Sequence, residues 1–179
     1  TQSLSGGIGL STDGRISLGG EAIPWNFSEV LDYYDARYGI TEDVGVAAWA
    51  PTLKGTHTLE QATDANQPAW TDGNSILFDG SNDFLQTAAF TLNQPTTVII
   101  VAKSITHTNS NYFCDGVTLN TGVIQQRDPS GNIQIYSGAT YLTGAITLPL
   151  GTYGIVSAVF NGTSSRLQLN IDSPVTAAN

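Results

Sequence analysis

From Val44 onward, short apolar stretches with a period of two alternate with turn sequences such as Asp-Gly, Asn-Gly and Ser-Gly-Asn. The stretch with the strongest β propensity is Thr96–Lys103 (TTVIIVAK). It is apolar and β-branched on both faces, as in strands buried inside a sandwich. Turns that recur roughly every 8–12 residues are typical of all-β sandwiches and jelly rolls. The pattern therefore predicts an all-β fold, an antiparallel two-sheet jelly-roll sandwich.

The other strands that this pattern predicts are Val46–Trp49, Ser75–Phe78, Phe84–Thr87, Tyr112–Cys114, Val123–Gln126, Ile133–Tyr136, Ile146–Leu148, Gly154–Phe160 and Arg166–Ile171. One stretch, Ser28–Tyr38, has helical spacing instead, because Val30, Leu31 and Tyr34 fall on one helix face. We expect a helical turn or a short helix there.

The first 24 residues are rich in Gly and Ser and differ from the rest of the chain. Ile8–Leu10 and Arg15–Leu18 flank an Asp-Gly pair, which predicts a hairpin with a primed turn. Two strands alone are marginal in water, so this hairpin is expected to pair with another chain or to pack on the main domain. We therefore expect an N-terminal arm or linker hairpin at residues 1–24 and one domain at residues 25–179, the alternative being that the hairpin is integral to that domain.

The charge balance excludes some classes of partner. The chain has 15 Asp and Glu against 6 Lys and Arg, a formal net charge of −9. Nucleic-acid binding needs clustered cations, so neither nucleic acid nor an anionic membrane surface is an expected partner. The longest apolar run has the length of a strand, which argues against membrane insertion. The single cysteine, Cys114, allows no internal disulfide and no cysteine metal cluster.

Two residues in the segment Phe78–Asp83 have the chemistry of a calcium or sugar-hydroxyl site. The carboxylates of Asp79 and Asp83 are hard oxygen ligands. The same sequence also predicts a tight turn between two strands, since Asp and Asn bond to their own backbone and Gly80 adopts positive φ. We expect the turn, braced by Asp83; calcium at these two residues remains the alternative, and no other cofactor is expected.

Aromatic and amide side chains near predicted loops are candidates for binding sugars. Trp49, on an alternating strand, is expected in the core, whereas Trp70 follows Gln67-Pro68 in a predicted polar loop and suits a surface platform. Tyrosines beside loops rich in Asn, Ser and Thr form adaptable hydrogen-bonding surfaces, although ordinary edge-strand composition gives the same pattern. The candidate carbohydrate-binding residues are Trp70, Asn109, Asn111, Tyr112, Asn132, Tyr136 and Tyr141.

The segment Asp35–Lys103 resembles the concanavalin A-like lectin/glucanase superfamily, and in particular the laminin-G-like jelly rolls of bacteriophage tail and fibre proteins, other virion proteins and secreted bacterial proteins. The order of the matching motifs carries this resemblance: Asp35-Ala36, Val46-x-x-Trp49, Gln61-Ala62-Thr63, Gln67-Pro68, Ile76-x-Phe78-Asp79-Gly80-Ser81-x-Asp83-x-Leu85 and the strand Thr97–Lys103. Ile155–Ile171 is similar to the penultimate hairpin of that family. Such folds usually add one or two closing strands after the position of Asn170. The resemblance therefore implies that the chain continues past Asn179, or that another chain or the N-terminal hairpin fills the gap.

The catalytic pattern of the family is missing. Its laminarinase-type branch needs Glu-x-Asp-x-x-Glu on one strand, so that two carboxylates flank the bond, and this chain has no such pattern. Gln134-Ile135-Tyr136 resembles the Gln-Ile-His strand of alginate lyases, without the His. His57 and His107 lie in predicted loops and are expected to be solvated. We therefore expect no enzyme.

Together, the resemblance and the neutral polar loops lead to a hypothesis about function. It is a non-catalytic surface module of a virion (tail, fibre or head decoration), an adhesin or lectin that binds host glycans or mediates particle assembly. We expect a homo-oligomer or contacts with other virion subunits, and a location on the virion surface or outside the cell. The alternative is a carbohydrate-binding module, or a degraded catalytic domain, of a secreted bacterial polysaccharide-active protein.

Overall fold

The computed structural model describes residues 8–10, 16–18, 21–22, 29–118, 121–138 and 140–176, with side chains from residue 29 onward except at 140, 144 and 145. Strands make up 42% of the chain and no helix reaches seven residues in this described part, which confirms the all-β prediction. The chain divides into an N-terminal unit, Thr1–Ala88, and a C-terminal unit, Ala89–Asn179. The sequence did not predict a boundary at Ala88, and the predicted boundary at residue 24 lies outside the described residues.

The N-terminal unit begins with a small antiparallel sheet. Strand β1 (Ile8–Leu10) pairs with β2 (Ile16–Leu18), and β3 (Glu21–Ala22) pairs with the other side of β2. Ile8 lies opposite Leu18, and Leu10 lies opposite Ile16. This pairing confirms the predicted hairpin, while its turn, residues 11–15, lies outside the described residues.

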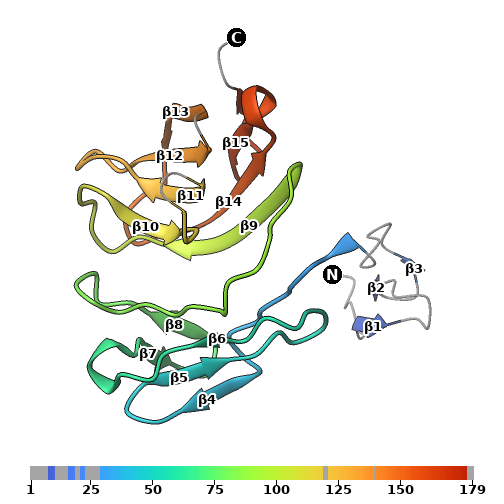
Figure 1. Cartoon of the computed structure of the whole chain (residues 1–179), viewed down its shortest axis with the longest axis vertical. Coiled ribbons are helices and arrows are strands. Elements are labelled where there is room, and N and C mark those ends of the chain that lie inside the picture. The colour runs from blue at the N-terminus through green and yellow to red at the C-terminus, as the bar shows by residue number, and fades with distance from the viewer. Residues whose placement is uncertain are drawn as a thin grey trace, which may run out of the picture. The chain divides into compact units, whose positions relative to one another are not determined.

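Two further small sheets complete the N-terminal unit (Figure 1). The first consists of β4 (Ile40–Glu42), β5 (Val46–Trp49) and β6 (Leu59–Glu60). The second consists of β7 (Ala69–Thr71) and β8 (Ser75–Leu77), and a 3-10 turn at Asp64–Asn66 precedes it.

Buried amide side chains connect the segments of this unit. The Oε1 atom of Gln67 accepts a hydrogen bond from the backbone N–H of Gly45 at 2.8 Å, and its Nε2 donates to the carbonyl of Gln61 at 3.0 Å. Gln61 in turn donates to the carbonyl of Phe84 at 3.2 Å. Both glutamines are buried, so they satisfy backbone groups that water does not reach.

Of the helical turn or short helix expected at Ser28–Tyr38, the described residues show a 3-10 residue at Glu29 and no α-helical residue after it, so an α-helix over residues 29–38 is excluded. The backbone of Tyr33 pairs instead with Lys54 and Thr52. The side-chain N–H of Trp49 donates to the carbonyl of Asp35 at 3.3 Å, and the backbone N–H of Tyr38 donates to the same carbonyl at 2.9 Å in a tight turn. Long-range hydrogen bonds therefore override a weak local helical preference.

The C-terminal unit contains two four-stranded antiparallel sheets (Figure 1). One runs in the order β10 (Asn111–Cys114), β11 (Thr121–Gln126), β12 (Asn132–Ser137) and β13 (Thr140–Thr147). The other runs in the order β16 (Val175–Thr176), β15 (Arg166–Leu169), β14 (Tyr153–Phe160) and β9 (Thr96–Lys103). A 3-10 turn at Gly162–Ser164 separates β14 from β15.

The two sheets share one apolar core, which gives the unit a β-sandwich-like architecture. Its buried members from both sheets are Ile124, Ile133, Ile135, Leu142, Ile146, Leu148, Val156, Ala158, Phe160, Leu167 and Leu169. They alternate along their strands with residues of the opposite faces, because side chains of a strand point alternately to its two sides. Strand β16 lies on the free side of β15, so one short strand does follow Asn170.

Strand β9 differs from the prediction of burial on both faces. Val98 and Ile100 pack against the core, whereas Ile99 and Val101 point away from it and are exposed. The strand has β14 as its neighbour in the sheet. The prediction failed because a long run of β-branched residues does not show which of its faces is covered.

Most of the other predicted strands are confirmed with shifted ends. The main exception is Phe84–Thr87, where the structure has one isolated bridge between Gln86 and Glu60. Phe84 bonds through its backbone to Asn66 instead, so this segment divides its hydrogen bonds between two neighbours and forms no continuous ladder. The sequence also missed β3, β4, β6, β7, β16 and residues 140–145 of β13.

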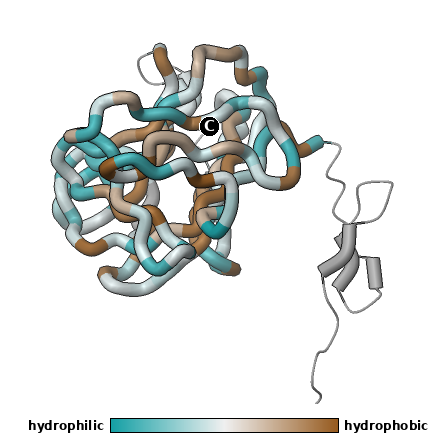
Figure 2. Tube along the Cα trace, turned by 90° about the horizontal axis from the view of Figure 1, so that it is seen from below, coloured by the Kyte–Doolittle hydropathy of each residue, from teal (hydrophilic) through white to brown (hydrophobic). Residues whose placement is uncertain are grey.

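Outside the grey residues, hydrophobic and hydrophilic positions alternate along the trace in Figure 2, as expected for strands with two different faces. In the described part, no helix is long and apolar enough to cross a membrane.

Candidate functional site

The register of β10–β13 decides which side chains share a face of this sheet. Directly opposite residues in antiparallel strands point to the same side. Ile124, Ile135 and Leu142 are opposite one another and belong to the core. The adjacent row therefore lies on the outer face, and it runs across all four strands as Tyr112, Gln125, Gln134 and Thr143. We refer to these four residues as the glutamine row.

The glutamine row has three polar atoms without a partner among the described residues. Gln125 donates from Nε2 to Oε1 of Gln134 at 3.3 Å. This leaves one amide oxygen and one amide nitrogen, and the Oγ1 atom of Thr143 is buried without a hydrogen bond. Gln125 and Gln134 are only 8% and 5% exposed. Of these three atoms, Oγ1 of Thr143 is the one that is fully buried. A buried polar atom without a partner is costly, and binding sites are one place where such atoms are found.

Tyrosine rings border this row. The next row on the outer face lies two positions further along each strand and consists of Val123, Tyr136 and Tyr141. We call it the tyrosine row, and we call the two rows together the polar face. The rings of Tyr136 and Tyr141 lie 5.9 Å apart between centroids. Tyr112, at one end of the glutamine row, and Tyr141 are both exposed, so aromatic surface flanks the buried amides.

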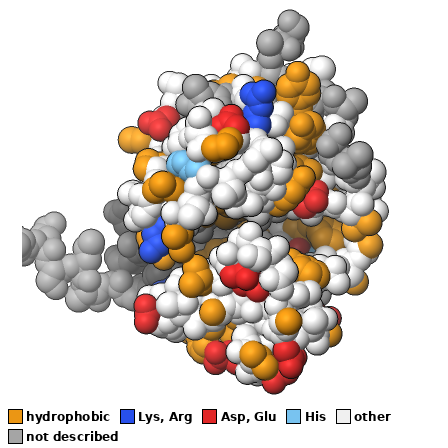
Figure 3. All heavy atoms as spheres, turned by 90° about the vertical axis from the view of Figure 1, so that its left-hand side faces the viewer, with side chains coloured by type: hydrophobic (Ala, Val, Ile, Leu, Met, Phe, Trp, Pro, Cys, Tyr) orange, Lys and Arg blue, Asp and Glu red, His pale blue; other side chains and the backbone are white. Residues whose placement is uncertain are grey.

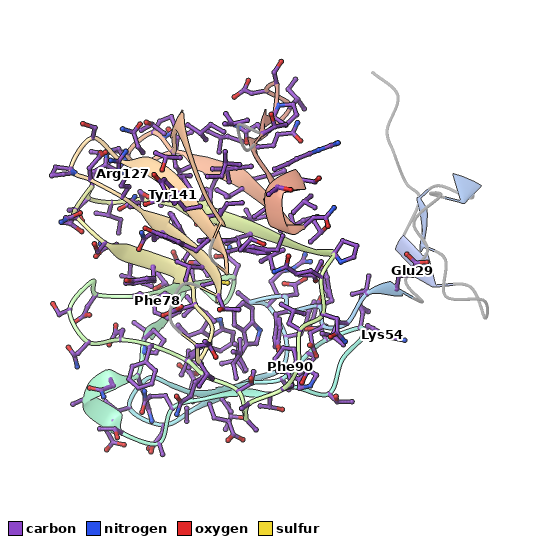
Figure 4. The ribbon with its side chains drawn as sticks, turned by 45° about the horizontal axis from the view of Figure 1, so that its top comes forward. Glu29, Lys54, Phe78, Phe90, Arg127 and Tyr141 are labelled. Atoms are coloured by element: carbon purple, nitrogen blue, oxygen red, sulfur yellow. The ribbon has the colours of Figure 1, made fainter. Side chains whose placement is uncertain are left out.

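Three of the predicted sugar-binding residues, Tyr112, Tyr136 and Tyr141, thus come together on the polar face. Figure 4 shows Tyr141 and Arg127 on the sheet of β10–β13. Gln125, Gln134 and Thr143 are not among the predicted sugar-binding residues. The alternation of apolar and polar residues at 124–126, 133–136 and 141–143 places these three side chains on the face away from the core. Only the register of the strands shows that they form one row.

Asn132 lies on the same side of the sheet but its amide is engaged. Its Oδ1 accepts from Thr147 at 3.1 Å and its Nδ2 donates to Asp128 at 3.1 Å. The hydrogen bond from Asn132, together with one from the backbone N–H of Ser130, holds the pKa of Asp128 below its usual value. Asn132 therefore braces the turn at the end of the sheet.

The other predicted sugar-binding residues lie elsewhere. Asn111 is opposite Gln126, a buried residue that donates to Ser104 at 2.7 Å, so Asn111 is on the other side of the sheet from Tyr112. Asn109 lies in the exposed turn before β10.

Trp70 belongs to the N-terminal unit, on strand β7 and not in the predicted polar loop. It is half-buried, and its indole N–H donates to the carbonyl of Ala36 at 2.8 Å.

The carboxylates of Asp79 and Asp83 form the predicted turn. Asp79 accepts hydrogen bonds from the backbone N–H groups of Ser81 and Asn82 at 2.8 and 3.2 Å, and Asp83 accepts one from the N–H of Asp79 at 2.8 Å. The N–H of Ser81, and then that of Asn82, lower the pKa of Asp79. The turn is confirmed, whereas calcium at Asp79 and Asp83 stays a prediction. The residues described contain no group of three or more His, Cys, Asp or Glu placed to hold a metal ion.

A second polar cluster lies in the N-terminal unit. Nδ1 of His57 is 2.8 Å from a carboxylate oxygen of Asp32, whose other oxygen accepts from the N–H of Thr56 at 3.0 Å. The hydroxyl of Tyr34 donates to the carbonyl of His57. Burial, and then the Asp32 carboxylate, raise the pKa of Tyr34 to about 12. The cluster joins segments about 25 residues apart, which is a structural role.

Both histidines are therefore less solvated than predicted. His57 is held by Asp32, and Nε2 of His107 lies 2.8 Å from the carbonyl oxygen of Leu148. Each imidazole is half-buried, because its loop folds back onto a neighbouring segment.

A shallow hollow of about 300 Å³ in the N-terminal unit has Glu60 and Gln86 in its wall, with Ala62, Thr87 and Ala88. Glu60 is the one carboxylate in this wall. Glycosidase chemistry uses two, so the hollow does not provide that pair.

We compared the chain with models of protein families, with curated protein sequences and with solved structures, and none of them matched. The resemblance to concanavalin A-like domains therefore stays a prediction.

Proposed function

We propose that this protein is a non-catalytic glycan-binding module and that it binds through the polar face of β10–β13. The observation that carries the proposal is the glutamine row, Tyr112–Gln125–Gln134–Thr143, with its three unpaired polar atoms. Sugar hydroxyls both donate and accept hydrogen bonds. Amides and hydroxyls on a rigid sheet are suited to them, since sites on strands hold their geometry better than sites on loops.

The tyrosines supply the second element of sugar recognition. The C–H face of a pyranose is apolar and packs on aromatic rings, and tyrosine adds a hydroxyl at the rim. Tyr136 and Tyr141 present neighbouring rings, and Tyr112 borders the row from the other side. Neither row contains a carboxylate, which supports binding without hydrolysis.

The proposal includes a concanavalin A-like jelly roll displayed on a virion or otherwise outside the cell. It is supported by the two four-stranded sheets around one core and by the motif order in Asp35–Lys103. Display in several copies would raise the apparent affinity of a weak site, because tethered sites act at a high effective concentration. A carbohydrate-binding module of a secreted bacterial protein would use the same face.

The test is retention of the full chain, coupled to beads in many copies, on an array of bacterial and animal surface glycans. The matched pair of variants is Tyr141→Ala and Tyr153→Ala, because these tyrosines are 62% and 56% exposed on the outer faces of the two different sheets. We expect Tyr141→Ala to lose at least about tenfold in binding and Tyr153→Ala to bind like the parent protein. Equal losses, or an array without any signal, would exclude binding through the polar face.

A second candidate function is assembly with further copies of this chain. It is favoured by the outer face of the other sheet, where Ile99, Val101 and Ile155 are exposed on adjacent strands. A second β9 could pair with this β9 in a self-complementary contact. Sedimentation of Val101→Asp should then give smaller particles than Val44→Asp, an exposed valine in the N-terminal unit. A parent protein that sediments as a monomer would remove this function.

A further inference from the structure

We infer that the polar face selects uncharged glycans, recognising a pair of neighbouring hydroxyls, and that it rejects sugars with carboxylate or sulfate groups. The inference rests on the proposed function and goes further, because it names the class of ligand. It derives from which atoms of the glutamine row lack partners and from the charges around them.

The unpaired atoms are one acceptor, one donor and one hydroxyl. Gln125 and Gln134 share a single hydrogen bond, so one amide oxygen and one amide nitrogen remain. Exchanging the oxygen and nitrogen positions in both side-chain amides would make Gln134 the donor and Gln125 the acceptor. One amide oxygen and one amide nitrogen would still lack a partner. Thr143, next in the row, adds a hydroxyl that is buried and unpaired among the described residues.

Only a ligand group that both donates and accepts can satisfy all three atoms. A sugar hydroxyl donates to the amide oxygen, and its neighbour accepts from the amide nitrogen. A carboxylate or sulfate only accepts, so it would place an oxygen against the unpaired amide oxygen. A polar site left partly unpaired in this way discriminates strongly between ligands.

Charge acts in the same direction. Each glutamine is more than nine-tenths buried, so an anion placed over them would lose hydration without gaining a cation. Arg127 lies two residues along the chain from Gln125 and bonds to Asn132 through the backbone. Asp128 lies beside Arg127, and its lowered pKa keeps it negative. The two charges offset each other, and the C-terminal unit as a whole has three acidic and three basic residues.

The experiment uses pairs of probes that differ only at C6. Hexasaccharides of glucose, galactose and mannose are each prepared in neutral form and with the C6 hydroxymethyl groups oxidised to carboxylates. Binding to the full chain is measured by calorimetry or by competition on the bead assay. We expect at least one neutral hexasaccharide to bind about tenfold or more tightly than its oxidised partner.

Two variants separate the hydroxyl mechanism from an ionic one. Thr143→Val keeps the side-chain shape and removes the unpaired hydroxyl, and we expect about tenfold weaker binding of the neutral probe by a protein that folds as before. Arg127→Gln should leave both forms unchanged. Oxidised probes that bind as well as neutral ones, or a loss of binding in Arg127→Gln, would overturn this inference and leave the proposed function in place. Absence of binding to every probe and to the array would overturn both.

Discussion

The two units of this chain differ in charge and in the interactions that stabilise them. Twelve of the fifteen acidic residues and three of the six basic ones lie in the N-terminal unit, so its formal charge is −9, whereas the C-terminal unit has three of each and is neutral. The surface in Figure 3 is correspondingly poor in basic side chains and largely neutral. In the C-terminal unit, eleven of the described residues form a buried apolar core.

The N-terminal unit relies instead on polar side chains that bond to its backbone. Gln67, Trp70, Trp49 and Asp32 each satisfy a backbone group of a distant segment. A fold built in this way depends on individual hydrogen bonds, whereas an apolar core distributes its stability over many contacts. The neutral unit is also the one whose outer face is free of charge at the glutamine row.

Two intrinsic probes report on the units separately. All three tryptophans lie in the N-terminal unit, and the single cysteine, Cys114, lies in the C-terminal unit. Burial, and then the nearby Asp115, raise the pKa of Cys114 to about 11, so its thiol reacts slowly until that unit unfolds. Denaturant titrations followed by tryptophan fluorescence and by thiol labelling therefore give one curve for each unit.

The largest expected effect is Phe160→Ala, which removes a fully buried ring from the core. The free energy of unfolding should fall by about 3–5 kcal/mol in the thiol-labelling curve. Ile171→Ala, at a residue that is 97% exposed, is the control and should change little. A shift confined to the fluorescence curve would contradict the assignment of this core to the C-terminal unit.

The next effect is Gln67→Leu, which keeps bulk in the N-terminal unit but leaves the N–H of Gly45 and the carbonyl of Gln61 unpaired. We expect a loss of about 2–4 kcal/mol in the fluorescence curve, since each buried unpaired group costs about 1–3 kcal/mol. Gln86→Leu, at an exposed position of the same unit, serves as the control. If Gln67→Leu were neutral, the polar account of this unit would be wrong.

A smaller loss is expected for Trp70→Phe. The change keeps an aromatic ring and deletes the N–H that donates to Ala36. One neutral hydrogen bond contributes about 1 kcal/mol, and Trp49 remains as the fluorescent reporter. An unchanged midpoint of unfolding would show that water replaces this bond without cost.

The smallest effect concerns Asp35, whose carboxylate accepts hydrogen bonds from Arg37 at 2.9 Å from Nε and 3.0 Å from the backbone N–H. The bond from the guanidinium lowers the pKa of Asp35. The stabilisation is therefore present above the unfolded-state pKa of about 3.9 and is lost as pH falls through the lower folded-state value.

Asp35→Asn should cost less than about 1 kcal/mol at neutral pH, as is usual for exposed ion pairs. The difference from the parent protein should vanish in acid, as followed by fluorescence unfolding at several pH values. A difference that persists in acid well below the folded-state pKa of Asp35 would assign the effect to the amide substitution and not to the charge.

Local periodicity in the sequence was enough to predict most strands of the C-terminal unit. In β12, Ile133 and Ile135 alternate with polar residues, and such alternation can be recognised without knowing which strands pair with it. The segment Ser28–Tyr38 was mispredicted because its hydrogen-bond partners, Lys54 and Thr52, are distant in sequence.

The candidate site was predictable only in part, because it depends on register. Irregularities between Tyr112 and Cys114, Thr121 and Val123, and Asn132 and Gln134 shift the pairing of neighbouring strands. A shift of one residue moves a side chain to the opposite face. Asn111 and Tyr112 are consecutive in one strand and point to opposite faces, but only the register shows that Tyr112 shares its face with Gln125 and Gln134. The glutamine row therefore could not be assembled from the sequence.

The most direct measurement is a titration of the isotope-labelled full chain with the best-bound neutral oligosaccharide, followed through the side-chain NH2 resonances of glutamine and asparagine. We predict that the signals of Gln125 and Gln134 move together and saturate, while that of Gln67 in the N-terminal unit stays in place. Stationary signals of Gln125 and Gln134, with changes at Gln67 or on the outer face of β9 and β14, would contradict recognition of sugar hydroxyls by the glutamine row.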